Sequence, residues 1–263
     1  YYFPRVKLRY NFTYKVKSFL KKLLPSIFSS GVTQINILIG TIIASFQTGA
    51  VSYLYYADRV YQINLAIAGV AVSTVSLPLL SREIKKGNVL KVKDIQNKSL
   101  ELSLLLSIPA AAGLVIASYD IINALFGYGS FEKNDVLKTS EALKYFGYGI
   151  PAFALVKVLS NLFFARGNTK TPFYISAIIV FLNVSVSLAY FNKIGFLIIP
   201  IATTLSTWIG TLIYFGILVK KKFYETRDNS KANILKIILS TTIMSIFLLI
   251  ALNYFSSNLD YSN

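Results

Sequence analysis

The sequence predicts an all-α membrane protein, a polytopic bundle of about seven spanning helices. Of its 263 residues 54% are hydrophobic, and the mean hydropathy is +0.57. Apolar runs of about 20 residues, the length that crosses a bilayer, recur along the chain, and the charged residues gather between them. The expected spans cover residues 24–46, 51–80, 100–125, 142–164, 172–191, 196–219 and 234–255.

The positive charges predict how these spans are oriented. The net charge is +16, and the basic residues lie mainly in 5–22, 82–98, 166–170 and 220–236, which flank alternate connections. Because loops rich in Lys and Arg stay in the cytoplasm, we expect the N-terminal end inside and the C-terminal end outside. Residues 1–23 fit a basic amphipathic segment on the cytoplasmic surface, with a solvated linker as the alternative.

Composition and motifs also exclude several kinds of function. The excess of positive charge is accompanied by no nucleic-acid-binding motif, so we expect no nucleic-acid partner. The chain has no Cys and no His, which removes thiolate metal sites and His-based catalysis. Because it also lacks a P-loop, a GxSxG elbow and a dinucleotide turn, we expect neither an enzyme nor a cofactor or metal. It begins Tyr-Tyr-Phe-Pro-Arg without Met, and we expect it to be a piece of a longer protein.

The span 51–80 carries Asp58 and Arg59 within its apolar run. A charge at membrane depth is costly unless it faces the bundle interior or a wet cavity. At helical spacing, Arg59 shares one face of the span with a stripe of polar or small residues. This stripe predicts a cavity wall, on which the guanidinium receives a phosphate. The alternative is a structural ion pair, although adjacent helical residues point about 100° apart, which disfavours Asp58 as the partner. The polar or small residues that share the face of Arg59 are Ser52, Tyr55, Tyr56, Gln62, Ala66, Gly69 and Ser73.

Two further spans carry candidate polar residues. Lys157 lies in the middle of 142–164 and either lines a cavity or contacts a helix carbonyl. The first span has a polar face, for which helix packing competes with substrate contact. Its residues are Ser29, Thr33, Asn36 and Gly40, with Gln34 beside them. The expected cavity residues are Arg59, Tyr55, Tyr56, Asp58, Gln62, Lys157, Gln34 and Asn36.

A possible ion site lies on the fifth and sixth spans. Asn183 and Thr203, with Ser187 one turn from Asn183, could supply oxygen ligands to a cation. Packing within the membrane is the alternative for the same residues.

Four segments resemble the MurJ (MviN) lipid II flippase family. The stretch YLYYADRVYQINLAIAGVAVSTVSLPLLSR contains the tyrosine-rich ADR box, the GVA stretch and the closing LPxLSR of that family. SSGVTQINILIGTIIASF is similar to the opening of its second lobe, and FGYGSFEKND to an outer-loop motif. FFARGNTKTP is similar to a motif with looser relatives across the wider multidrug/oligosaccharidyl-lipid/polysaccharide exporter superfamily. The resemblance covers nearly the whole chain.

The resemblance implies a fold and a division of the chain. Residues 24–221 would form the six-helix second lobe of a two-lobe transporter, and 222–263 a cytoplasmic connection with the first helix of a terminal pair. The partners it implies are lipid II, membrane lipids and a missing N-terminal lobe of the same protein, which would be monomeric when complete. It also implies the bacterial inner membrane.

The implied function is to move lipid II, an undecaprenyl-pyrophosphate-linked precursor of peptidoglycan, from the cytoplasmic to the outer leaflet by alternating access. Arg59 matches the family's essential cavity arginine, and Lys157 matches a lysine of related members. Gln62 stands where some relatives have Glu. Some members bind Na⁺ through carboxylates together with Asn and Thr, but Gly40 and Ser187 stand at the acid positions here, which argues against that site.

Two other functions compete with this one. Another transporter of the same superfamily, either a polysaccharide-unit flippase or a drug/cation antiporter, would share the fold. A non-transporting scaffold of cell-wall assembly would use Arg59 for contacts with protein partners. An arginine-lined cavity disfavours a drug-cation site, which would prefer acidic side chains.

Overall fold

The computed structural model describes residues 14, 16–17, 34, 36–227 and 229–258. Most of the expected surface segment 1–23 and the start of the expected first span lie outside these residues, while 36–44 are helical. The elements that follow are α2 (Ala50–Leu65), the π-helix η1 (Ala66–Ala71), α3 (Val72–Lys85), α4 (Val89–Ile116), α5 (Ser118–Phe126), α6 (Lys133–Phe164), α7 (Lys170–Ile194), η2 (Gly195–Leu197), α8 (Ile198–Lys220) and α9 (Ser230–Asn258).

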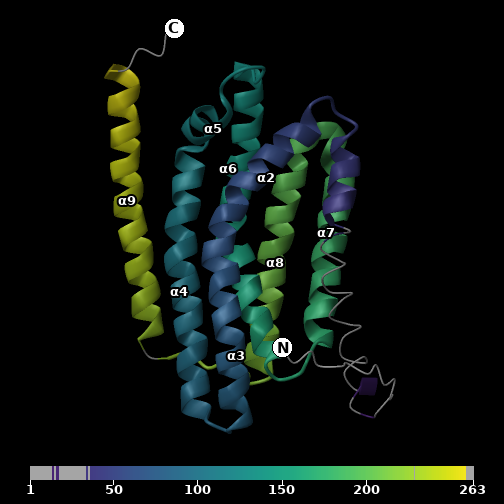
Figure 1. The fold of residues 1–263 in the computed structure, drawn as a ribbon, viewed down its shortest axis with the longest axis vertical. Helices are drawn as coiled ribbons and strands as arrows, with labels where there is room; N and C mark the ends of the chain where they lie inside the picture. The colour runs from purple at the N-terminus through teal and green to yellow at the C-terminus, as the bar shows by residue number, and fades with distance from the viewer. Residues whose placement is uncertain (1–13, 15, 18–33, 35, 228, 259–263) are drawn as a thin grey trace, which may run out of the picture.

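The long helices lie side by side in one bundle (Figure 1). α6 occupies the centre and packs against α2, α4 and α8, while α9 flanks α4 at one edge and α7 flanks α8 at the other. The most apolar stretch of α6 is 67% buried, against 11% for that of α9. The central helix is therefore enclosed by protein, whereas α9 turns most of its apolar surface outward, as a helix in lipid does.

The all-α membrane bundle is confirmed. In the described part of the chain, five helical stretches are long and apolar enough to cross a membrane, and one of them, Lys170–Lys220, contains both α7 and α8. These two helices are separate because Gly195 has a φ of 73°, a left-handed conformation that ends α7. The spans expected at 172–191 and 196–219 are thus two helices.

Successive connections alternate between two ends of the bundle (Figure 1). The connections at 86–88, 165–169 and 221–229 share the end that we call the basic end, and those at 45–49 and 127–132 share the opposite end. The alternation that the charge pattern predicted is thus confirmed. The basic end carries a concentration of positive side chains, among them Arg82, Lys85, Lys86, Lys91, Lys93, Lys98, Arg166, Lys170, Lys220, Lys221, Lys222 and Arg227.

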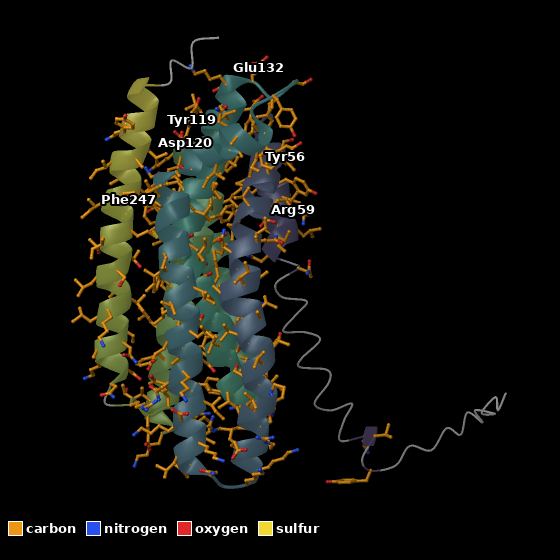
Figure 2. The ribbon with its side chains drawn as sticks, turned by 60° about the vertical axis from the view of Figure 1, so that its left-hand side comes forward. Tyr56, Arg59, Tyr119, Asp120, Glu132 and Phe247 are labelled. Carbon is orange, nitrogen blue, oxygen red and sulfur yellow. The ribbon has the colours of Figure 1, made fainter. Side chains whose placement is uncertain are left out.

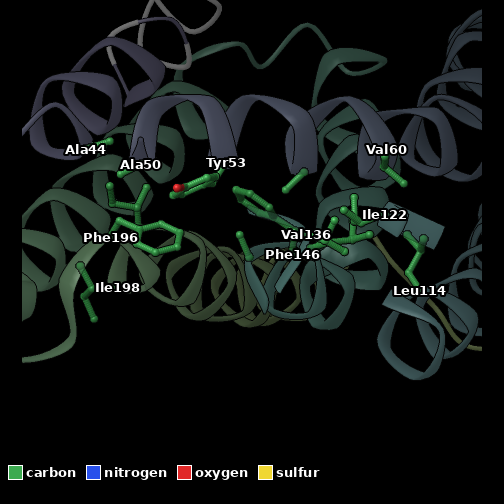
Figure 3. Packing of buried hydrophobic residues seen from close by; sticks show 14 of the residues in the cluster. Ala44, Ala50, Tyr53, Val60, Leu114, Ile122, Val136, Phe146, Phe196 and Ile198 are labelled. Atoms are coloured by element: carbon green, nitrogen blue, oxygen red, sulfur yellow. The ribbon is translucent and has the colours of Figure 1, made fainter. Parts of the chain in front are cut away.

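Buried apolar side chains form two clusters along α6. Figure 3 shows the cluster nearer the opposite end, where Tyr53 of α2 packs on Phe196 with ring centroids 5.7 Å apart, and where Phe146 of α6 is buried. The second cluster joins α3, α4, α6 and α8 through residues such as Leu80 and Leu218, both fully buried. Because lipid is as apolar as these side chains, close packing rather than exclusion from water holds the helices together.

The single helix expected over 100–125 is wrong. The chain breaks at Ala117, which has a φ of −101° and a ψ of 22°, and α5 runs on separately at the opposite end (Figure 1). The turn places Ile122 of α5 in the core, where it is fully buried in the cluster that contains Leu114 and Val136. Burying Ile122 requires α5 to fold onto the bundle instead of continuing α4.

The helix expected to begin at 142 begins earlier, at Lys133. Glu132 is its N-cap, and the Glu132 backbone nitrogen donates to Asp135 Oδ2 at 2.9 Å while the Glu132 side chain accepts from the Asp135 backbone. This reciprocal capping box satisfies amide groups at the helix start. A polar first turn therefore extends α6 beyond its apolar stretch.

Hydrogen bonds to Asn97 fix the connection between α8 and α9 onto α4. The Asn97 side chain is buried, and its Oδ1 accepts from the Tyr224 hydroxyl at 3.0 Å and from the Arg227 amide at 3.2 Å. The Ser230 hydroxyl also donates to this oxygen, at 3.1 Å. Asn97 Nδ2 in turn donates to the Glu225 carbonyl at 2.9 Å. We call this set of contacts around Asn97 the α4 clasp.

Residues next to Asn97 on α4 extend the α4 clasp in both directions. Glu101 accepts from the Ser230 hydroxyl at 2.5 Å and from Asn233 Nδ2 at 2.8 Å, which holds the first turn of α9. Gln96 Nε2 donates to the Phe223 carbonyl at 2.8 Å, which holds the part of the connection that follows α8. The connection is thus attached to α4 along its length.

An ion pair supports the α4 clasp at the surface. Arg227 donates to Asp94 Oδ1 at 2.8 Å, and Lys98 lies 2.8 Å from Asp94 Oδ2. The hydrogen bond from Lys98, together with the charges of Lys98 and Arg227, lowers the pKa of Asp94. The carboxylate therefore remains ionised near neutral pH and keeps both cationic partners.

Arg166, from the FFARGNTKTP segment, anchors the same connection to α6. Its guanidinium donates to the Phe223 carbonyl at 3.0 Å and to the Leu162 carbonyl at 2.7 Å. It also lies 4.5 Å from the centroid of the Phe223 ring. A planar fork of donors suits two carbonyls and a ring face at once. The arginine of this segment is thus a structural clamp at the basic end.

Candidate functional site: a polar cavity and an exposed arginine

A cavity of about 410 Å³ opens between α2, α6, α7, α8 and the helical stretch 36–44. Among its described lining residues, Asp58 and Lys157 carry charge. Five of the expected cavity residues and both expected ion-site residues lie on it, whereas Arg59, Tyr56 and Gln34 do not. Its polar lining residues are Asn36, Thr41, Tyr55, Asp58, Tyr61, Gln62, Lys157, Ser176, Asn183, Thr203 and Thr207.

Asp58 and Arg59 face different surroundings although they are adjacent in sequence. Asp58 lines the cavity, where it accepts a hydrogen bond from Gln62 Nε2 one turn further along α2. Arg59 is exposed and projects from the flank of α2 away from α9 (Figure 2). The two side chains form no ion pair, because neighbouring positions on a helix point about 100° apart. The alternative of a structural pair between them is therefore not realised in the described structure.

The Arg59 guanidinium is held by a tyrosine and by no carboxylate among the described residues. Its central carbon lies 4.6 Å from the centroid of the Tyr55 ring, and Tyr55 is itself 53% exposed. Tyr55 stands at i−4, on the same helical face, and also lines the edge of the cavity. A permanent charge on an intramembrane helix is stable only beside water or a polar partner. The Arg59 charge on this face of α2 therefore has to meet water, an anionic ligand or a polar partner.

Lys157 reaches the cavity from α6, and its ammonium group has no hydrogen bond or ion pair among the described residues. Its backbone carbonyl, in contrast, accepts from the Ser73 hydroxyl at 3.2 Å and from the Ser160 hydroxyl at 2.9 Å. Contact of the ammonium with a helix carbonyl, the alternative to a cavity role, is not formed. The charge is available to whatever enters the cavity.

The expected ion-site residues lie together with Asn36. Asn183 is buried, donates from Nδ2 to Asn36 Oδ1 at 2.7 Å, and accepts from the Ser187 and Thr203 hydroxyls, each at 3.4 Å. Gly40 faces Ile199. The donor set is neutral, and the described residues contain no group of three acidic or sulfur or imidazole side chains. Because a hard cation prefers carboxylate oxygens, this neutral cluster is poorly suited to one.

The inner half of the polar stripe packs against α6 and does not line the cavity, contrary to expectation. A Cβ on Gly69 would lie 3.0 Å from the Ala154 Cα, so the two helices touch at their backbones there. Asn161 of α6 is buried and donates to the Ser73 carbonyl at 2.6 Å, the Ser73 hydroxyl at 2.8 Å and the Ser76 hydroxyl at 3.2 Å. Gly69 lies within the π-helix η1, and the contacts of Asn161 follow directly after it, where the π-helical turn disturbs the regular backbone pattern.

Two residues of this region had no role in the sequence interpretation. Tyr61 lines the cavity between Phe146 and Phe153, with ring centroids 4.7 Å and 5.6 Å away. Asn161 joins α6 to α3 as described. The signal for Asn161 was its polar side chain in an apolar span, which marks a helix contact in a membrane protein.

The comparisons with known proteins agree with this architecture. A family model described as "Lipid II flippase MurJ" matches residues 3–262. The chain belongs to the MurJ family. It is 38% identical to a probable lipid II flippase MurJ of Rhizobium meliloti (strain 1021) over 92% of the chain and 45% of that relative. A probable lipid II flippase MurJ of Rickettsia prowazekii (strain Madrid E) is 35% identical over 91% of the chain and 47% of that protein.

Solved structures match the chain both within this family and in a more distant transporter family. A lipid II flippase MurJ in an inward closed conformation matches with a TM-score of 0.78 and 30% identity, over 98% of this chain and 52% of that one. An outward-facing multidrug transporter of the MATE family matches with a TM-score of 0.67 at 18% identity, which shows a shared fold alone. The chain spans about half the length of the curated relatives that it matches. The family's members are named flippases, which are transporters and not enzymes.

Proposed function

We propose that this chain is one lobe of a lipid II flippase. In this proposal the complete protein moves the undecaprenyl-pyrophosphate-linked precursor from the cytoplasmic to the outer leaflet by alternating access. The single observation that carries the proposal is the family match over residues 3–262. The relatives are about twice as long as this chain, which leaves room for a second lobe. In the proposal, that second lobe faces the exposed flank of α2.

The chemistry of Arg59 fits this role. A diphosphate cannot enter hydrocarbon with its charges unpaired, so a transporter must supply cationic and hydrogen-bonding groups at membrane depth. Arg59 offers a planar fork of donors that stays charged in a low-dielectric site. Lys157 and the polar cavity lie on the adjacent side of α2, where Asp58 partly balances the charge. The lipid tail would remain in the bilayer while the headgroup crosses.

The function is tested by a chimera in which this chain replaces the matching half of the Rhizobium meliloti relative. We expect the chimera to restore growth of cells depleted of their own lipid II flippase. The unmodified relative is the positive control, and the relative without its matching half is the negative control. If the chimera is inserted in the membrane and never restores growth, while an antiporter or polysaccharide-flippase assay gives activity, another transporter of the superfamily is the correct assignment. Membrane insertion without any transport would favour the scaffold.

We also propose that the chain lies in the bacterial inner membrane with its basic end in the cytoplasm, as the positive-inside rule predicts. Because the chain has no Cys, single cysteines can report each end. Val89 and Tyr128 are matched positions, 67% and 72% exposed at the basic and the opposite end. We expect a membrane-impermeant maleimide to label Tyr128→Cys in spheroplasts and to label Val89→Cys only after lysis. The reverse pattern would contradict the orientation.

A further inference from the structure

The loop that joins α5 to α6 grips the helix that carries Arg59. The Tyr56 ring contacts two phenylalanines of this loop region, with its centroid 4.8 Å from that of Phe126 and 5.4 Å from that of Phe131. The two phenylalanine rings lie 6.3 Å from each other, so the three rings form one cluster. Their interplanar angles of 50°, 84° and 48° are the tilted and edge arrangements that aromatic pairs prefer.

The cluster continues along α2 to the guanidinium. The Tyr55 ring meets the Tyr56 ring edge-on, at 5.9 Å and 79°, and the central guanidinium carbon of Arg59 lies 4.6 Å from the Tyr55 centroid. Figure 2 shows Tyr56 and Arg59 one above the other on the same flank of α2. Each step is a direct contact, so the loop reaches Arg59 through two tyrosines.

A glycine and a helix cap constrain the loop. Gly127 is required after Phe126, because a Cβ there would overlap the side chain and carbonyl of Asn123. Asp135 closes the capping box of α6 and also accepts from the Tyr53 hydroxyl at 2.8 Å, one helical turn from Tyr56. The loop is thus tied to α2 at Tyr56, and the first turn of α6 that follows it is tied to α2 at Tyr53.

We propose that the segment from Phe126 to Phe131 positions Arg59 for the anionic headgroup, acting through Tyr56 and Tyr55. This inference rests on the proposed function, in which Arg59 receives a diphosphate. An arginine side chain has many rotamers, and a guanidinium stacked on a fixed ring loses less freedom when a ligand binds. The tyrosine-rich ADR box and the outer-loop segment, about 70 residues apart in sequence, therefore form one binding element.

The test measures binding of lipid II to the chimera in which this chain replaces the matching half of the Rhizobium meliloti relative, in nanodiscs of phosphatidylethanolamine and phosphatidylglycerol, by native mass spectrometry. We expect Tyr55→Leu to weaken binding about threefold to tenfold, because it removes the cation–π support, while Tyr55→Phe keeps wild-type affinity. Since Tyr55 is largely exposed, this variant should leave the thermal unfolding midpoint unchanged. The double variant Phe126→Leu with Phe131→Leu should give a similar loss.

Controls separate positioning from a general loss of structure. Tyr128→Leu alters an exposed ring of the same loop that contacts neither Tyr56 nor Arg59, and should bind as the wild type does. In an Arg59→Ala background, Tyr55→Leu should have no further effect, because the group that it positions is gone.

The outcomes distinguish the inference from the function on which it rests. If Arg59→Ala weakens binding and Tyr55→Leu does not, or if their effects simply add, the inference is wrong and the proposed function stands. If Arg59→Ala leaves binding unchanged, Arg59 does not bind the headgroup, and both its proposed role and the inference are wrong. Equal losses for Tyr55→Leu and Tyr55→Phe would also overturn it, since the ring would then not be the positioning group.

Discussion

Replacing Arg59 with alanine should abolish the ability of the flippase chimera to support growth. Arg59 is the exposed cation on the flank of α2, and no described carboxylate neutralises it. Removing a charge-assisted contact to a phosphate costs about 1.5–3 kcal/mol, which is about tenfold to a hundredfold in affinity. The same charge is also needed while the headgroup crosses the low-dielectric region, so the loss affects transport as well as binding. Growth after depletion and accumulation of lipid II measure the result.

The charge and the fork of Arg59 can be tested separately. Arg59→Lys keeps a positive charge but loses the planar donor fork, so we expect partial function. Lys193→Ala is the control, because it removes one positive charge at the opposite end, where Lys193 lies 5.9 Å from the Tyr190 ring centroid. Cells that carry this variant of the chimera should grow normally. Normal growth of an Arg59→Ala chimera that is present in the membrane at wild-type amounts would refute the role given to this residue.

Replacing Asn97 with leucine should release the connection between α8 and α9. The substitution keeps a similar volume but leaves the Tyr224 hydroxyl, the Arg227 amide and the Glu225 carbonyl without their buried partner. Each lost partner of a buried polar group costs about 1–3 kcal/mol, so we expect local destabilisation of about 3 kcal/mol. Trypsin should then cut at the exposed Lys220–Lys222 run at least about tenfold faster, because local opening limits cleavage.

A graded series separates the α4 clasp from global stability. Tyr224→Phe removes one hydrogen bond to Asn97 and should accelerate cleavage only slightly. Asn88 caps α4 by accepting from the Lys91 amide at 3.1 Å, away from the connection, so Asn88→Ala should not change cleavage at Lys220–Lys222. Wild-type cleavage of Asn97→Leu at these lysines would show that the α4 clasp does not hold the connection.

Much of the fold could be predicted from local sequence patterns, because a membrane allows the backbone few structures. Every backbone amide in lipid must be satisfied within its own helix, so an apolar run of bilayer length has little choice of structure. The alternating charge of the connections fixed which loops share an end, and it agrees with the bundle in Figure 1. The motifs around Arg59, Phe126 and Arg166 identified the family before any contact was known.

The different surroundings of Asp58 and Arg59 could be predicted in part from helix geometry. Helical geometry alone separates adjacent side chains by about 100°, so one could line a cavity and the other could not do so equally well. From the sequence we expect both side chains on the cavity wall, but only Asp58 lines the cavity. That depended on where α6 and α7 lie around α2.

Only the tertiary structure decided the features that depend on residues far apart in the chain. The break at Ala117 exists because Ile122 finds a core site beside Leu114, which no local pattern shows. Asn97 looks like any polar residue near a helix end until the connection folds over it. Sequence determined the helices, the family and the intramembrane charges, because these depend on each segment's own affinity for lipid. Packing determined what each charge faces, because that depends on which distant side chains occupy the same space.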